Sequence, residues 1–171
     1  YNGSGATVRG FNVEGRAAFT RWFELQAGVT LQQSRYKEPE FWSEDAEVPP
    51  VRRMFRTPDA YGYFTASFKP VRNFTADLSG TCTGSMLVQH MAGSGVAQDV
   101  AVSTPSFFDM NIRLSYDVRI YKEITMQLYG GVQNLFNAYQ KDFDKGVDRD
   151  SGYIYGPSLP RSWFVGAKFS F

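Results

Sequence analysis

A strict alternation of apolar and polar residues is the feature that most constrains the fold of this chain. Across residues 109–118 every even position is apolar and every odd position is polar. Such a period of two places one kind of side chain on each face of a β-strand. An α-helix would spread both kinds around its circumference, because its period is 3.6 residues. The segment is therefore expected to form a strand with one apolar and one polar face.

The same alternation recurs along the chain. The expected strands cover residues 11–17, 24–32, 61–69, 74–86, 109–118, 124–133 and 162–171. The connections between these seven segments alternate between short and long. Short turns are expected at 20–22, 69–73 and 119–123, and long loops at 36–60, 90–106 and 136–160. All long loops should therefore leave one end of the sheet and all short turns the other.

Transmembrane β-barrels sort their connections in this way, with short periplasmic turns and long extracellular loops. Aromatic residues also gather near the strand ends on the short-turn side, as in an interfacial girdle. They are Trp22, Phe23, Phe68, Phe74, Tyr116, Tyr121, Phe169 and Phe171. The alternative is a soluble β-sandwich with an aromatic core. We therefore predict an all-β fold, a transmembrane antiparallel β-barrel in the outer membrane of a Gram-negative cell.

The polar residues of the strands are expected to face the lumen, since a charge facing lipid at mid-bilayer costs a few kcal/mol. They include Glu24, Asp77, Asp109, Arg113, Gln127 and Lys168. Cys82 falls on the lipid side, where it would act as a small hydrophobic residue. Single-chain bacterial barrels have even strand numbers, and counting back from a periplasmic Phe171 places Tyr1 outside the cell. We therefore expect the C-terminal part of a larger barrel, or alternatively a small barrel with an eighth, unrecognised strand.

Composition excludes several other classes. A net charge of +1 gives no electrostatic reason to expect nucleic-acid binding. Runs of roughly 18 apolar residues, which a membrane-spanning helix needs, are missing. An aromatic content of 16% argues against intrinsic disorder.

Three stretches carry a resemblance to a known family: LSGTCTGSMLVQHMAG (78–93), VQNLFNAYQKDFDKG (132–146) and YGPSLPRSWFVGAKFSF (155–171). They resemble TonB-dependent outer-membrane receptors, in particular those of Bacteroidota and of the vitamin and siderophore type. The resemblance implies a barrel of about 22 strands around an N-terminal plug. Residues 1–171 would supply its C-terminal seven strands, with the plug and earlier strands absent. Asn12, where the family often has Glu, and Cys82, where an aromatic is common, depart from the pattern without threatening the fold.

By this resemblance the whole protein would take up a scarce nutrient, such as a siderophore, haem or cobalamin, with energy from TonB. Its partners would be the plug and remaining strands, TonB through the absent N-terminal part, outer-membrane lipid and lipopolysaccharide, and a possible surface lipoprotein. No cofactor is expected. The resemblance also implies that the last strand is an assembly signal, carried by Trp163, Phe169 and Phe171.

Two other functions are alternatives. A small autonomous barrel could serve as an adhesin or membrane anchor. An outer-membrane protease or lipase is disfavoured, because neither Ser85 nor Ser158 has a histidine placed to activate it. No catalytic residue is therefore expected.

The first long loop carries the best candidates for ligand binding. It combines aromatic and arginine side chains, which binding surfaces favour, and arginine suits carboxylates and phosphates. The candidates are Phe41, Trp42, Arg52, Arg53 and Arg56, together with His90 of the second long loop. The alternative for these arginines is contact with lipopolysaccharide phosphates.

His90 and a group of aspartates in the third long loop are two further features that could suggest a ligand or metal site. His90 could be a haem or metal ligand, but we favour a solvated loop histidine. Asp142, Asp144, Asp148 and Asp150 lie close together, as in calcium-binding loops. An EF-hand needs glycine at its sixth position, where this chain has Val147 or Tyr153. We therefore expect a solvated surface loop and no metal site.

Overall fold

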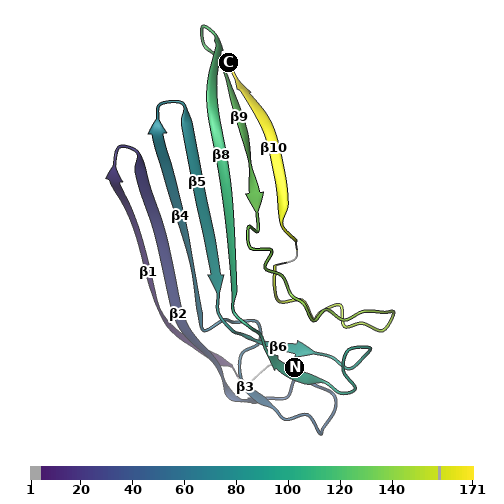
Figure 1. The fold of residues 1–171 in the computed structure, drawn as a ribbon. Coiled ribbons are helices and arrows are strands. Elements are labelled where there is room, and N and C mark those ends of the chain that lie inside the picture. The colour runs from purple at the N-terminus through teal and green to yellow at the C-terminus, as the bar shows by residue number, and fades with distance from the viewer. Residues whose placement is uncertain (1–4, 158) are drawn as a thin grey trace.

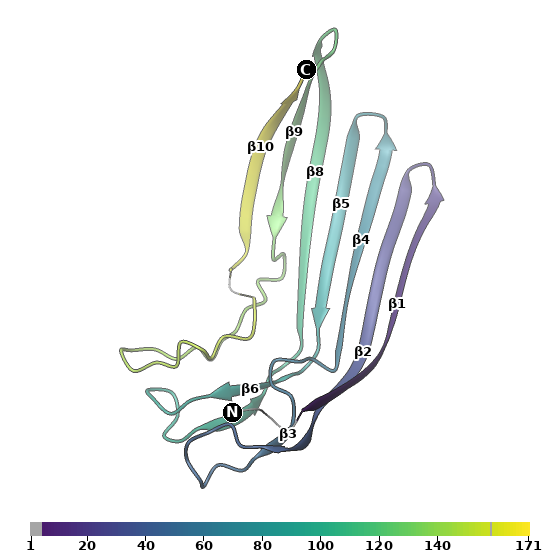
Figure 2. The same ribbon diagram turned by 180° about the vertical axis from the view of Figure 1, so that it is seen from behind.

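Seven long antiparallel strands form one curved sheet in a computed structural model that describes residues 5–157 and 159–171 (Figures 1 and 2). Tyr1 and Ser158 lie outside the described residues. The sheet has the order β1-β2-β4-β5-β8-β9-β10. Its strands are β1 (Ala6–Thr20), β2 (Phe23–Glu40), β4 (Ala60–Val71), β5 (Phe74–Thr83), β8 (Phe107–Tyr121), β9 (Ile124–Gln133) and β10 (Ser162–Ser170). Within these residues no helix is long and apolar enough to cross a membrane.

All seven predicted strands are confirmed, but some bounds differ. β1 and β2 extend well beyond residues 11–17 and 24–32, because they keep pairing as far as Ala6 and Tyr36 after the apolar alternation has ended. β5 ends at Thr83 instead of residue 86, since the chain turns away where the Gly84 N–H donates to the Ala60 carbonyl. The long loops contain three short strands that the sequence did not predict: β3 (Val51–Arg53), β6 (Leu87–His90) and β7 (Val100–Ser103).

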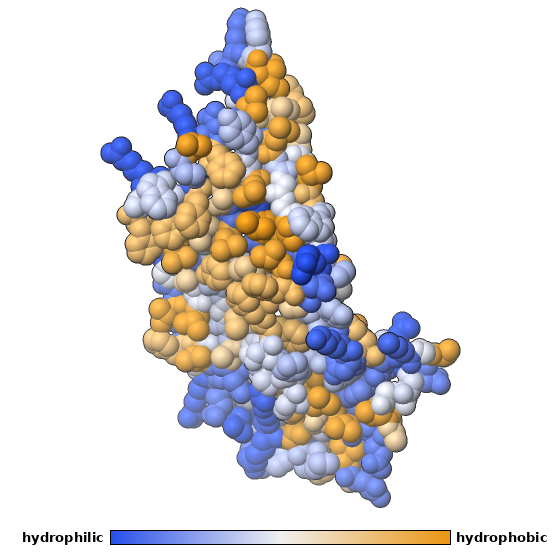
Figure 3. Space-filling view, viewed as in Figure 1, coloured by the Kyte–Doolittle hydropathy of each residue, from blue (hydrophilic) through white to orange (hydrophobic). Residues whose placement is uncertain are grey.

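The two faces of the sheet have the predicted character. The cross-strand partners Glu24 and Ser67, Ser67 and Asp77, and Asp77 and Arg113 place their side chains on one polar face. The other face is apolar and largely exposed, with Trp163 at 77% and Val165 at 89%. Figure 3 shows hydrophobic side chains across the middle of the strands, with hydrophilic ones toward both ends. An apolar surface of this size requires another apolar phase or a partner to cover it.

The sheet is open over the described residues, because β1 pairs only with β2 and β10 only with β9. All short turns lie at one end, together with the C-terminus, and the long loops form a layer at the other (Figure 1). Part of the predicted aromatic cluster stacks at the short-turn end. The Phe23 ring lies 4.6 Å from that of Phe68, and the Trp22 ring 6.3 Å from that of Phe68. The predicted sorting of the connections is therefore confirmed.

Glycines opposite aromatic residues allow rings to lie flat on the sheet. A side chain at Gly80 would collide with the ring of Phe64, its partner on β4. Gly80→Val is therefore expected to destabilise the folded protein by about 1–3 kcal/mol, since overpacking forces the ring off its rotamer. Urea unfolding of the full-length protein in detergent measures this change. Gly15→Val is the control, because open space surrounds Gly15; equal destabilisation by both substitutions would contradict this explanation.

Candidate functional site

Hydrogen bonds between the three long loops hold the loop layer together. Arg56 of the first loop donates to the carbonyls of Gly152 and Ile154 in the third. The Met91 N–H of the second loop donates to the Asp150 carboxylate at 2.8 Å. Ser43 donates to Asp99 at 2.6 Å, which joins the first and second loops. The loops therefore form one connected layer over the end of the sheet.

His90 lies at the centre of this layer. The residue is 7% exposed, its Nε2 lies 3.0 Å from both carboxylate oxygens of Asp144, and its ring stacks on Tyr153 at 3.7 Å. The prediction of a solvated loop histidine is therefore wrong. The third loop folds over His90, and no local sequence signal could indicate this, because Asp144 lies 54 residues further along the chain.

The aspartates of the third loop also bind groups of the protein itself. Tyr153 and Tyr155 donate to the two carboxylate oxygens of Asp142, at 2.8 and 2.6 Å. Asp144 accepts the Asp150 N–H at 3.1 Å, and its side chain is only 4% exposed. The expectation of a solvated aspartate loop is thus wrong for Asp144, whereas Asp142 and Asp148 are exposed as expected. The described part of the chain contains no cluster of three or more His, Cys, Asp or Glu residues suited to a metal ion.

The environment shifts the proton affinities of these groups. Burial opposes ionisation of Asp144, but hydrogen bonds from the Asp150 N–H and from His90 outweigh it and hold its pKa below the usual range. The pKa of Asp142 is lowered in the same way, with Tyr155 and Tyr153 as donors. Burial, together with the bond to Asp142, raises the pKa of Tyr155 to about 12 and raises that of Tyr153 as well.

These pKa shifts predict the pH range in which the loops stay folded. The lowered pKa of each aspartate stabilises the folded loops above about pH 4, and this contribution is lost as the pH falls through the folded pKa. The raised pKa of the tyrosines stabilises the loops below about pH 10 and is lost as the pH rises toward their folded values. The protection factors of loop amides, which compare each exchange rate with the intrinsic rate at the same pH, should therefore be high between these limits and fall on both sides. A loss of protection at alkaline pH that persists unchanged in Tyr153→Phe/Tyr155→Phe would contradict this account.

The structure does not gather the predicted ligand residues into one site. Phe41 is 72% exposed, and Trp42 packs edge-on against Phe55 at 5.3 Å. Arg52 donates to the Lys37 carbonyl at 3.0 Å. Arg53 donates to the Ser85 carbonyl at 2.7 Å and pairs with Asp59 at 2.9 Å.

Arg56 and His90 instead connect the long loops, because Arg56 donates to carbonyls of the third loop and His90 lies against Asp144. Within the part of the chain that the structure describes, four of the six candidates bond to another loop or strand, and Phe41 and Trp42 do not. A ligand-binding role for all six stays a prediction.

Three pockets lie where the third loop meets β8 and β9. The largest, of 580 Å³, is lined by aromatic and polar residues that include Phe107, Phe136, Tyr139 and Tyr155. Two others, of 280 and 340 Å³, share Asp109 and Pro157. One carboxylate oxygen of Asp109 is buried there without a hydrogen-bond partner among the described residues. Sequence reasoning placed Asp109 on the polar face but did not indicate that a loop would cover it.

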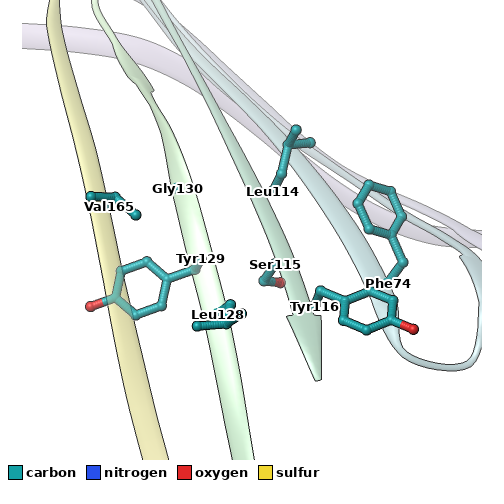
Figure 4. A pocket seen from close by; sticks show the side chains of 8 residues that line it. All are labelled: Phe74, Leu114, Ser115, Tyr116, Leu128, Tyr129, Gly130 and Val165. Atoms are coloured by element: carbon teal, nitrogen blue, oxygen red, sulfur yellow. The ribbon is translucent and has the colours of Figure 1, made fainter. Parts of the chain in front are cut away.

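A hollow of another kind lies on the apolar face. It has a volume of 270 Å³ and opens over Gly130, between Leu114, Leu128 and Val165 (Figure 4). Its walls are almost wholly apolar, so it offers no group that could orient a polar ligand. We regard it as part of the apolar surface.

Comparisons with known proteins agree with this architecture. The sequence matches no protein-family model and no curated protein. The structure is similar to the ferric-catecholate import receptor Fiu from E. coli K12, with a TM-score of 0.64, 20% identity and 95% of this chain covered. It is also similar to the siderophore receptor PiuA from Acinetobacter baumannii, with a TM-score of 0.63, 18% identity and 95% covered. The fold is that of a segment of these receptors.

The predicted fold class, an antiparallel β-barrel wall, is thereby confirmed. The chain spans about a fifth of the length of each receptor, 20% of Fiu and 21% of PiuA. Both similar proteins are receptors by name. The likeness in fold agrees with the resemblance to outer-membrane receptors, whereas the siderophore and Bacteroidota parts of that resemblance stay predictions.

Proposed function

We propose that this chain supplies part of the barrel wall and the extracellular loops of a TonB-dependent outer-membrane receptor that takes up a ferric siderophore. The observation that carries this proposal is the match to a ferric-catecholate import receptor over 95% of the chain. Haem and cobalamin are the alternative cargoes. The plug and the contact with TonB belong to the rest of such a receptor.

The two faces of the sheet support the membrane placement. The apolar face exposes large side chains, including Phe11 at 66% and Leu31 at 54%, which lipid would cover. The polar face carries charged side chains such as Arg113, which lies over the ring of Tyr129 and donates a hydrogen bond to Gln127. Charged groups of this kind suit a lumen filled with water or with a plug.

The open edges of the sheet disfavour the adhesin or anchor alternative. Strand edges with unpaired N–H and C=O groups cannot face hydrocarbon, so a spanning sheet has to close. Neither β1 nor β10 has an outer neighbour among the described residues, and further strands would have to complete the wall. A larger barrel supplies them.

Cargo is expected to contact the loop layer and the part of the polar face nearest the long loops. Aromatic side chains such as Phe41 and Phe107 could contact an organic chelate, and arginines its anionic groups. The pockets beside Asp109 lie on the same side of the sheet as the lumen.

Uptake by cells tests this function. The gene that encodes the whole receptor would be deleted, and uptake of iron-55 would be measured with a catecholate siderophore, a hydroxamate siderophore and haem, and of cobalt-57 with cobalamin. We expect uptake of one ferric siderophore to fall at least about tenfold and to return on complementation with the intact gene. Unchanged uptake of every ferric siderophore would refute the proposal. A selective loss of cobalamin or haem uptake would identify that compound as the cargo instead.

A further inference from the structure

A cluster of basic side chains lies on the outer face of the sheet, just beyond its apolar belt. Phe11 and Leu31 form the last apolar pair of β1 and β2 on this face. Toward the loops, the next outward positions are Arg9, which pairs with Gln33, then Arg35, which pairs with Thr7, and finally Lys37. We call Arg9, Arg35 and Lys37 the basic patch.

The basic patch is exposed and without acidic partners. All three side chains belong to exposed residues, and none takes part in the ion pairs found within the described residues. The stem of Lys37 runs beside Gly5, 3.8 Å from where a Cβ of that glycine would lie. In Figure 3 a hydrophilic region lies below the apolar belt at the loop ends of β1 and β2.

The patch lies at the level expected for lipid headgroups. From Phe23 to Leu31 the apolar row of β2 extends for about 27 Å along the strand, at roughly 3.4 Å per residue. For a barrel strand tilted by about 40° this corresponds to about 21 Å along the membrane normal. An outer-membrane barrel has an apolar belt roughly 25 Å tall. The next residues of β2 on the same face after Leu31 are Gln33, which pairs with Arg9, and Arg35. They would therefore lie at the boundary of the outer leaflet.

A polar pocket adjoins the patch where β2 separates from β4. Pairing between these strands ends at Leu31 and Ala60, and β3 becomes the neighbour of β2 at Arg35 and Arg53. The gap is a pocket of 220 Å³. It is lined by Gln32, Gln33, Ser34, Arg35, Arg53 and Asp59.

The outward wall of the pocket contains a hydrogen-bond donor without a partner. Arg53 pairs with Arg35, so both side chains lie on the outward face. Nε of Arg53 is buried without a hydrogen-bond partner among the described residues. Buried polar groups are ordinarily hydrogen-bonded, so this donor favours an acceptor-rich occupant.

The charges of the pocket select an anion. Asp59 pairs with Arg53 at 2.9 Å, which neutralises that arginine and leaves Arg35 as the unpaired charge. Guanidinium groups bind phosphate through two parallel N–H bonds. Arg9 and Lys37 add positive charge beside the pocket.

We propose that a phosphate group of an outer-leaflet glycolipid binds at this pocket, with the basic patch around it and its acyl chains along the apolar faces of β1 and β2. The site depends on the membrane placement proposed above. A cargo anion is a poorer fit, because the patch lies on the apolar side of the sheet, opposite the polar face. The apolar residues directly below the patch suit acyl chains.

Titration of the purified full-length receptor in nanodiscs tests this site. Native mass spectrometry would count bound diphosphoryl lipid A, and the dephosphorylated lipid and inorganic phosphate would be titrated in parallel. Arg9→Gln/Arg35→Gln/Lys37→Gln should weaken diphosphoryl lipid binding at least about tenfold. The matched control is Arg21→Gln/Arg72→Gln/Lys122→Gln, which removes three exposed basic residues from the short turns and should bind as the wild type does.

Three outcomes would overturn the proposal: equal binding by the patch and control variants, equal binding of the dephosphorylated lipid, or inorganic phosphate binding as tightly as the lipid. If the triple variant does not fold, Arg35→Gln alone should weaken binding several-fold and Arg35→Lys should restore much of it. Siderophore uptake by the same cells separates the two proposals. Loss of lipid binding with normal uptake supports the lipid site, whereas absence of uptake by the wild type refutes only the transport function.

Discussion

Replacing Trp163, Phe169 and Phe171 together by alanine is expected to lower the amount of receptor in the outer membrane at least about tenfold. These side chains are 77%, 52% and 94% exposed, and Trp163 and Phe169 lie on the apolar face of β10. Transfer of each aromatic side chain from water to an apolar phase contributes roughly 2 kcal/mol. Their loss would remove lipid contacts from this strand. Immunoblots of outer-membrane fractions, with and without heating, measure the amount of folded receptor.

A control on the same strand separates lipid contact from general damage to β10. Lys168 and Ser170 pair with Gln127 and Thr125 and face the polar side. Lys168→Ala/Ser170→Ala should therefore leave the amount of receptor near that of the wild type. Equal losses in both variants, or no loss in the aromatic variant, would contradict the assembly role proposed for these three residues.

Asp144→Ala is expected to open the loop layer and reduce siderophore uptake at least about tenfold while the barrel stays in the membrane. The Asp144 side chain is 4% exposed and binds both His90 and the Asp150 N–H. Its removal leaves the ring of His90 buried without its partner, at a cost of about 1–3 kcal/mol. The second and third loops, still joined by hydrogen bonds of Met91 and Ser94, would then separate more readily. Trypsin cleavage after Lys145 and Arg149 in the full-length receptor reports this opening.

Asp148→Ala provides the matched control in the same loop. Asp148 is exposed, and its backbone carbonyl, which the substitution preserves, accepts the Ser94 N–H. This variant should retain wild-type uptake and trypsin resistance. If Asp144→Ala stayed resistant, or if Asp148→Ala opened equally, the bond between His90 and Asp144 would not be what joins the loops.

The membrane-facing part of the fold was predictable because its environment imposes a local rule. Every second side chain of a strand meets the same surroundings, so residues 109–118 and 124–133 show their two faces in the sequence itself. The rule weakens at the loop ends of β1 and β2. There Arg9 and Arg35 lie on the outward face, where apolar residues would have continued the pattern.

The loop layer was not predictable, because its contacts join residues far apart in the chain. The bond from His90 to Asp144 spans 54 residues, and that from Arg56 to Ile154 spans 98. Neither follows a periodic pattern. The short strand β3 likewise places Arg53 opposite Arg35 through a loop whose course no local residue indicates.

Labelling of single cysteines on intact cells tests the membrane topology most directly. In a full-length receptor with Cys82→Ser and no other reactive thiol, Val147→Cys would mark the third loop, where Val147 is 98% exposed, and Lys122→Cys a short turn. A membrane-impermeant maleimide should label Val147→Cys on intact cells and Lys122→Cys only after the outer membrane is permeabilised. Labelling of Lys122→Cys on intact cells, or protection of Val147→Cys until permeabilisation, would contradict an outer-membrane barrel with its long loops outside.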